Sequence, residues 1–218
     1  MRPDLRLRLL AAVRGVRWQT LASLAVAVLV AVGASRVSVL LRTPADRQLV
    51  SPVLDSGILV GLSAPVAMLG HLIHDRAPWL LATSARPARG PRVLWLATLT
   101  AAAGAVGWGV TLLVGAQVSR LLVFADFGLL FALALLTGVV AGGQLSWLCP
   151  VLVAVVASTP GIVPLRYNVI VQARYDVQIL CAAALVWAAA GLLFVGFDEY
   201  GLSREARLFR RTSLLSDE

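Results

Sequence analysis

The feature that most constrains this chain is a run of 39 residues, at 127–165, without a single charged side chain. A helix rises about 1.5 Å per residue and needs about 20 apolar residues to cross a hydrocarbon core about 30 Å thick. The run is too long for one crossing, and Gly142-Gly143-Gln144 supplies a turn that divides it into two. Because 59% of all residues are hydrophobic and the mean hydropathy is +0.86, we expect an integral membrane protein.

Further uncharged runs follow the same pattern along the chain. We therefore predict an all-helical, polytopic membrane protein whose six crossings form one domain at 18–199. The fifth run is short and contains Pro150, and Pro160, Gly161 and Pro164 after it predict a broken or re-entrant segment before the last crossing. The six crossings are expected at about 18–35, 56–74, 93–115, 121–141, 145–159 and 177–197.

The two ends of the chain are more polar than the crossings. Residues 1–17 carry five arginines, and their apolar residues recur at helical spacing, which predicts an amphipathic helix at the membrane surface. A basic flank that only anchors the first crossing is the alternative. A cleaved signal peptide is not expected, because the apolar run that follows is too long and no cleavage site stands out. Residues 200–218 are expected to form a cytoplasmic tail.

All 19 basic residues are arginines, against 11 acidic residues, and most of them flank the apolar runs. With six crossings, 13 of the 19 fall on the side of the two chain ends. Cytoplasmic loops are enriched in Arg and Lys, so we expect both termini in the cytoplasm of a multi-pass protein of the plasma membrane. The pI of about 11.1 then reflects lipid headgroups and topology, and nucleic acid is not an expected partner.

The chain lacks the residues of several kinds of catalytic site. It has no lysine, which a P-loop needs to reach the terminal phosphates, so it cannot be a P-loop ATPase by itself. Neither His-Glu-x-x-His nor Gly-x-Ser-x-Gly occurs. We therefore expect no enzyme, and neither a cofactor nor a metal on this chain. Cys149 and Cys181 lie inside apolar runs and are expected to be buried free thiols.

Four polar residues near or within the apolar runs are candidates for a gating role. His71 and His74 share a helix face at the end of the second crossing, and Asp75 follows them. A metal site, a proton-sensitive contact with a partner and a plain polar rim are the alternatives for this group. Asp126 is an ionisable residue inside an apolar run, which marks a functional candidate. It lies six residues after Arg120, so contact with headgroup water is the alternative.

Residues 75–92, between the second and third crossings, form a basic loop that we expect on the cytoplasmic side. Within this loop, 77–85 predicts a two-turn helix that begins near Pro78 and offers an apolar contact. Arginines and prolines then lead into the third crossing. The residues expected to contact a soluble partner are Trp79, Leu80, Leu81, Arg86, Arg89 and Arg92.

This order of elements resembles the permease subunits of ABC-2 type ABC exporters, in particular small actinobacterial ones. That family has six helices per subunit, an amphipathic helix before the first, a coupling helix after the second and a broken segment before the last. The resemblance implies a dimer of two permease subunits, identical or not, with two ATP-binding subunits that hold ATP and Mg²⁺ and contact the 75–92 loop. The cargo would be an amphipathic or hydrophobic compound such as an antibiotic, a peptide or a lipid.

Two other classes of protein stay open. One is a stand-alone membrane protein that acts as an immunity or scaffold protein. The other is a proton-coupled carrier that uses Asp126 and the histidines, for which inverted repeats would be the sequence sign. The direction of transport does not follow from the residues.

Overall fold

The computed structural model describes residues 18–36, 54–73, 89–114, 119–159, 162–164 and 167–201. Within these ranges the chain forms α-helices joined by turns, without a strand, so the prediction of an all-helical chain is confirmed for them. The elements are α2 (Trp18–Ala34), α3 (Ser56–His71), α5 (Arg89–Leu113), α6 (Arg120–Ala141), η2 (Gly143–Leu145), α7 (Leu148–Ser158), η4 (Ala173–Tyr175) and α8 (Asp176–Gly201).

The helices fall into two length classes. Three stretches are long and apolar enough to cross a membrane, at Arg92–Leu113, Arg120–Ala141 and Ala173–Gly196. Three others, at Trp18–Ala34, Ser56–His71 and Gly143–Ser158, are apolar but shorter. Each expected crossing overlaps one of these helices, while the six-crossing arrangement stays a prediction. The expected surface helix at 1–17 and the tail from 202 onwards lie outside the described residues.

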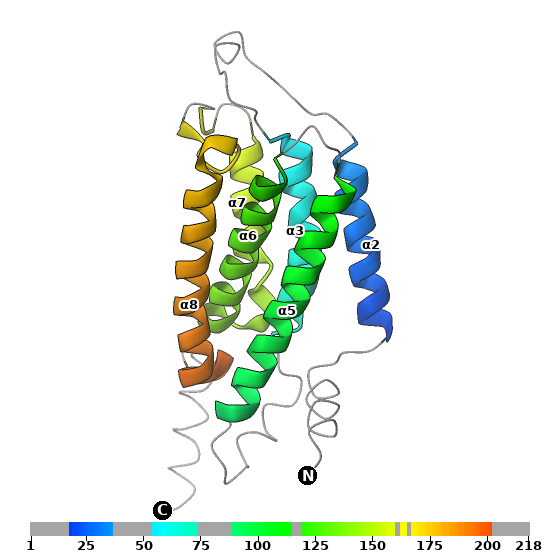
Figure 1. Cartoon of the computed structure of the whole chain (residues 1–218). Helices are drawn as coiled ribbons and strands as arrows, with labels where there is room; N and C mark the ends of the chain where they lie inside the picture. Colours follow the sequence, from blue (N-terminus) through cyan, green and yellow to red (C-terminus); the bar gives the residue numbers. More distant parts are fainter. Residues whose placement is uncertain are drawn as a thin grey trace, which may run out of the picture.

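The six helices lie side by side and alternate in direction (Figure 1). The indole Nε1 of Trp95 donates a hydrogen bond of 3.2 Å to the carbonyl of Leu72, which ties the start of α5 to the end of α3. At the opposite end, the Ser158 hydroxyl donates to the Ser56 carbonyl over 3.3 Å, which ties the end of α7 to the start of α3. We call these the Arg92 end and the Arg120 end of the bundle, after the first turns of α5 and α6.

Helix α6 is the centre of the bundle. It packs against α8, α3, α5 and α7. In an apolar stretch of 18 residues, 61% of the residues of α6 are buried, against 33% for α5 and 28% for α8. The core is built of large apolar side chains from α3 and α6, because these two helices have neighbours on several sides. The fully buried members include Leu59, Leu62, Leu69, Phe127, Leu130 and Leu135.

Small residues set the distance between some of the helices. A Cβ built on Gly61 of α3 would lie 2.9 Å from the Cβ of Ala34 and 3.1 Å from the Cα of Ala31, so α2 lies directly on the glycine backbone. A Cβ on Gly107 of α5 would lie 2.7 Å from the ring of Phe127. Both distances are shorter than real Cβ contacts, so each close approach requires glycine.

Helix α6 ends at Gly142, where the uncharged run divides. The φ of Gly142 is +97°, a conformation that glycine adopts at little cost and other residues rarely do. The chain turns there through η2 and returns as α7. Ser146, which follows η2, packs against Gly70 of α3 and Gly138 of α6, so the turn is in contact with both helices.

The described part of the segment between α7 and α8 is bound to the Arg120 end of the bundle. The amide of Leu54 donates to the carbonyl of Val171 over 2.7 Å, and the Asn168 amide donates to the carbonyl of Ala157 over 2.7 Å. The side chain of Gln172 in turn donates to the carbonyl of Asn168 over 3.1 Å. The helical path is thus broken between α7 and α8, while re-entry of this segment into a membrane stays a prediction.

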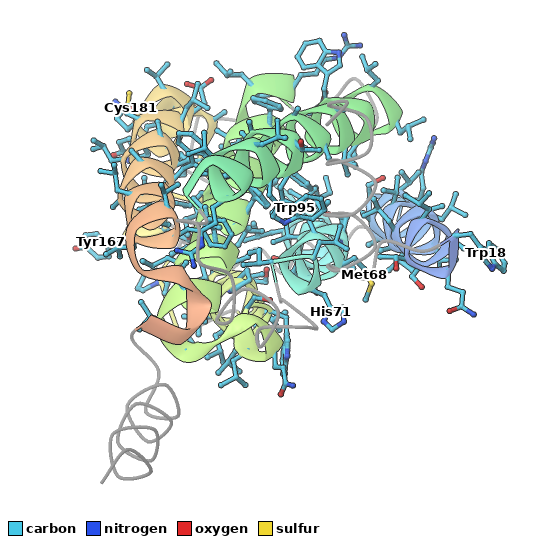
Figure 2. All side chains as sticks on the ribbon, turned by 90° about the horizontal axis from the view of Figure 1, so that it is seen from below. Trp18, Met68, His71, Trp95, Tyr167 and Cys181 are labelled. Atoms are coloured by element: carbon cyan, nitrogen blue, oxygen red, sulfur yellow. The ribbon has the colours of Figure 1, made fainter. Side chains whose placement is uncertain are left out.

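The outer faces of the bundle are apolar as well. In Figure 2, Trp95 points between the helices, whereas Trp18 and Cys181 point away from them. Both cysteines are free, but the expectation that both are buried is wrong for Cys181, which is exposed, while Cys149 is half-buried. An apolar run does not reveal which of its faces meets a neighbour, and Cys181 lies on an outer face of α8.

Candidate functional site

Most of the expected partner contact lies outside the described residues. Of its six members, Trp79, Leu80, Leu81 and Arg86 are not described, and Arg89 and Arg92 begin α5. The bond between Trp95 and Leu72 fixes both attachment points of the 74–88 connection at the Arg92 end. Both attachment points lie at the end of the bundle where α2 begins and α8 ends (Figure 1).

The histidine cluster is described only in part. His71 is the last residue of α3 and its side chain is exposed, whereas His74 and Asp75 lie outside the described residues. Among the residues that the structure describes, no three His, Cys, Asp or Glu side chains gather to form a metal site.

Asp126 is the most unusual side chain of the core. It is 0% exposed, and within the described part of the chain neither carboxylate oxygen has a hydrogen-bond partner. Spacings of three and four residues place it on the same face of α6 as Leu122, Val123 and Leu130, all of which are buried. Burying a polar side chain without a hydrogen-bond partner is costly, so Asp126 is not explained by packing and stays a candidate functional residue.

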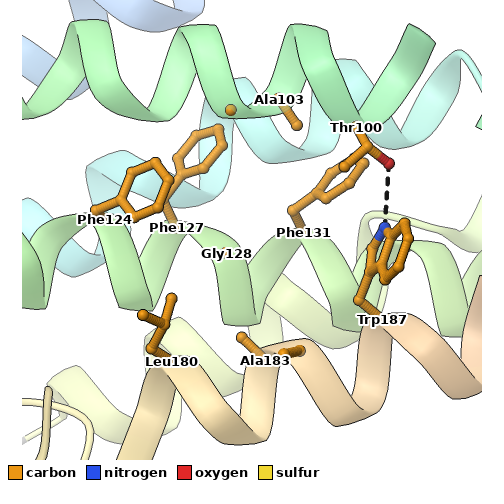
Figure 3. A pocket seen from close by; sticks show the side chains of 11 residues that line it. Thr100, Ala103, Phe124, Phe127, Gly128, Phe131, Leu180, Ala183 and Trp187 are labelled. Atoms are coloured by element: carbon orange, nitrogen blue, oxygen red, sulfur yellow. Dashed lines mark hydrogen bonds between the residues drawn. The ribbon is translucent and has the colours of Figure 1, made fainter. Parts of the chain in front are cut away.

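A groove that the sequence analysis did not anticipate runs between α5 and α8, with α6 as its floor (Figure 3). Its volume is about 250 Å³. Phe124, Phe127 and Phe131 form the floor, and Thr100 and Gly104 belong to the α5 wall. Only the three helices that are long enough to cross a membrane contribute to it.

One hydrogen bond bridges the two walls of the groove. Nε1 of Trp187 on α8 donates to the hydroxyl oxygen of Thr100 on α5 over 3.1 Å (Figure 3). The same hydroxyl donates to the carbonyl of Leu96 over 2.8 Å. Both polar side chains that line the groove therefore satisfy each other or the backbone, and the surface left for a ligand is apolar.

The sequence does contain a signal for the floor of this groove. Phe124, Phe127 and Phe131 are spaced by three and four residues, which places their rings on one face of a helix. The walls of the groove could not be predicted in this way, because α5 and α8 are apolar on every side and their periodicity does not show which face meets a neighbour.

Comparisons with known proteins do not identify a family for this chain. No protein-family model, no curated protein and no solved structure matches the chain.

Proposed function

We propose that the chain is the membrane-spanning permease subunit of an ATP-driven exporter. The observation that carries the proposal is the alternating direction of the helices, which brings the start of α2, the end of α3, the start of α5 and the end of α8 to one end of the bundle. The sequence concentrates 13 of its 19 arginines in the segments attached to that end. A soluble cytoplasmic partner could therefore contact all three segments at once.

The energy for transport would come from that partner. The chain has no lysine and hence no P-loop, so ATP and Mg²⁺ would be held by a separate ATP-binding subunit. Closure of the ATP-bound partner would move Trp79, Leu80, Leu81 and Arg86, together with Arg89 and Arg92 at the start of α5. Such a movement shifts the helices only if the partner binds one conformation of the bundle more tightly than the other.

The cargo that suits this subunit is amphipathic or hydrophobic. The outward-facing side chains of α2, α5 and α8 are mostly apolar, and the large ones include Leu29, Leu112 and Leu192. The groove between α5 and α8 is apolar too. An antibiotic, a peptide or a lipid fits these surfaces better than an ion. A second permease subunit, identical or different, would complete the path across the membrane.

Charge reversal tests the proposal. We expect the variant with Glu at Arg86, Arg89 and Arg92 to lose its ATP-binding subunit during purification in mild detergent. The matched control places Glu at Arg36, Arg42 and Arg47, which belong to the connection between α2 and α3; the end of α2 and the start of α3 lie at the Arg120 end. ATPase activity that copurifies with the tagged wild-type chain, and the P-loop subunit identified by mass spectrometry, are the readouts. Equal losses in the two variants, or no ATPase with the wild-type chain, would contradict the proposal.

One observation favours a second candidate, a proton-coupled carrier. Asp126 is buried without a hydrogen-bond partner among the described residues, and ionisable residues within apolar helices mark proton and ion pathways. In liposomes without ATP, a carrier would move protons with the wild-type chain and would stop with Asp126→Asn. An exporter subunit would show no ATP-independent proton flux in either form. The two candidates therefore give opposite results in one assay.

A further inference from the structure

We infer that the groove between α5, α6 and α8 binds one acyl chain of a phospholipid, whose phosphate lies at Arg120. The inference requires that the three helices cross a membrane. It does not require an ATP-binding partner, and so it stands or falls separately from the exporter proposal.

The lining of the groove selects for hydrocarbon. Its floor is made of phenylalanine rings, and its two polar side chains, Thr100 and Trp187, are hydrogen-bonded to each other. A polar or charged ligand would lose its bonds to water there without replacement, which is costly. An acyl chain has no such bonds to lose. The occupant is therefore a hydrocarbon chain, and any headgroup that belongs to it has to lie outside the groove.

Arg120 marks where that headgroup would lie. It precedes Phe124, Phe127 and Phe131 by four, seven and eleven residues, so all four side chains share one face of α6. Arg120 is exposed at the first turn of the helix. A guanidinium binds phosphate oxygens through two parallel hydrogen bonds, and the N-terminus of α6 adds a favourable dipole for an anion.

The other charges at this end leave an excess of positive charge. Arg174 lies in η4 and Asp176 begins α8, the helix that forms the opposite wall. Asp176 accepts a hydrogen bond of 2.7 Å from the amide of Val177, which places its carboxylate against the helix end. Arg120, Arg174 and Asp176 together carry two positive charges and one negative charge, which suits a phosphate.

Depth along the helix agrees with the length of an acyl chain. Eleven residues separate Arg120 from Phe131, which is about 16 Å of helix and close to half of a hydrocarbon core of about 30 Å. With Arg120 at the headgroups, the groove spans one leaflet. The bond between Thr100 and Trp187 then bridges its walls near the middle of the membrane, where the chain of a lipid ends.

Two glycines of α5 provide a matched pair of variants. A Cβ on Gly104, which lines the groove, or on Gly109, which does not, would meet no heavy atom within 4 Å. The first atom of a new side chain therefore has room at either position, but only Gly104→Leu extends a side chain into the groove. The third variant is Arg120→Gln, which removes the proposed phosphate contact and leaves the groove unchanged.

Native mass spectrometry of the full chain in mild detergent tests the site, with phosphatidylglycerol and diacylglycerol as probes. The wild-type chain should retain one phosphatidylglycerol, Gly109→Leu should equal it, and Gly104→Leu should bind at least about tenfold more weakly. Arg120→Gln should bind the two probes equally, because diacylglycerol has the same chains without the phosphate. Equal binding to the two glycine variants would overturn the inference. So would a groove filled by a second copy of the chain, or by a host compound that phosphatidylglycerol does not displace.

A measurement on the wild-type chain keeps the inference testable if Gly104→Leu does not fold. A phosphatidylglycerol with a photoreactive group in the middle of one acyl chain should crosslink to α6 peptides that contain Phe127 and Phe131, and to the α8 peptide that contains Trp187. Crosslinks spread over all outer faces, including the exposed face of α2 around Leu29, would mean bulk lipid contact only and would overturn it.

Discussion

Helices α6 and α2 are similar in composition but differ in their positions in the bundle. Both are almost wholly apolar, yet α6 packs against four helices and α2 lies at the edge of the bundle, chiefly against α3. Phe127 of α6 is 2% exposed, whereas Leu29 of α2 is 68% exposed. Hydropathy describes both helices equally well, so it does not reveal which of them organises the core.

The two helices also use different means to pack. The buried residues of α2 are Ala27 and Ala31, and α2 lies against the bare backbone of Gly61. Helix α6 instead inserts large side chains such as Phe127 and Leu130 between its neighbours. Contacts between small residues bring helix backbones close together, while large interlocking side chains remove more apolar surface from the surroundings. The centre should therefore be sensitive to lost volume and the edge to added volume.

The largest expected effect comes from lost volume at the centre. Phe127→Ala should lower the free energy of unfolding by about 3–5 kcal/mol, because a ring is removed from a site enclosed by α5 and α6. Leu29→Ala on α2 should change it by less than about 0.5 kcal/mol, because that side chain is exposed. Unfolding titrations in detergent measure both. Comparable losses in the two variants would show that the outer face of α2 is covered in the assembled protein.

Added volume at the edge should rank second. Gly61→Leu places atoms within 3.1 Å of the α2 backbone, so α2 has to move outwards, at a cost of about 1–3 kcal/mol. Gly33→Leu adds the same side chain to α2 itself, where nothing lies within 4 Å, and should be nearly neutral. Thermal unfolding midpoints compare the pair. A neutral Gly61→Leu would mean that α2 does not need its close approach to α3.

The sequence predicted the helices better than it predicted their neighbours. Charge-free runs placed the helices, because a long stretch without charges permits little else, and the run at 127–165 divides at Gly142 as the turn sequence indicates. The central position of α6 was not predictable, since an apolar helix shows no distinct face to periodicity analysis. The groove was missed for the same reason. Its floor follows from the spacing of Phe124, Phe127 and Phe131, but its walls depend on where α5 and α8 lie.

A substitution at Asp126 tests whether the buried carboxylate at the centre of the bundle lowers the stability of the fold. Asp126→Leu replaces two carboxylate oxygens without hydrogen-bond partners among the described residues by two methyl groups in a similar branched shape. We expect the variant to be more stable by about 1–2 kcal/mol, because the cost of burying an unpaired polar group disappears. The same unfolding titration measures it. A loss of stability would reveal that Asp126 has a partner in the assembled protein.

Asp55 gives the smallest effect and the opposite sign. It is the N-cap of α3, and its carboxylate accepts a hydrogen bond of 2.9 Å from the amide of Gly57. Asp55→Ala removes that cap and should lower the free energy of unfolding by about 1 kcal/mol, whereas Asp55→Asn keeps an acceptor and should recover most of the loss. Thermal midpoints of the three forms decide. If alanine and asparagine proved equally harmful, the charge rather than the cap would matter at Asp55.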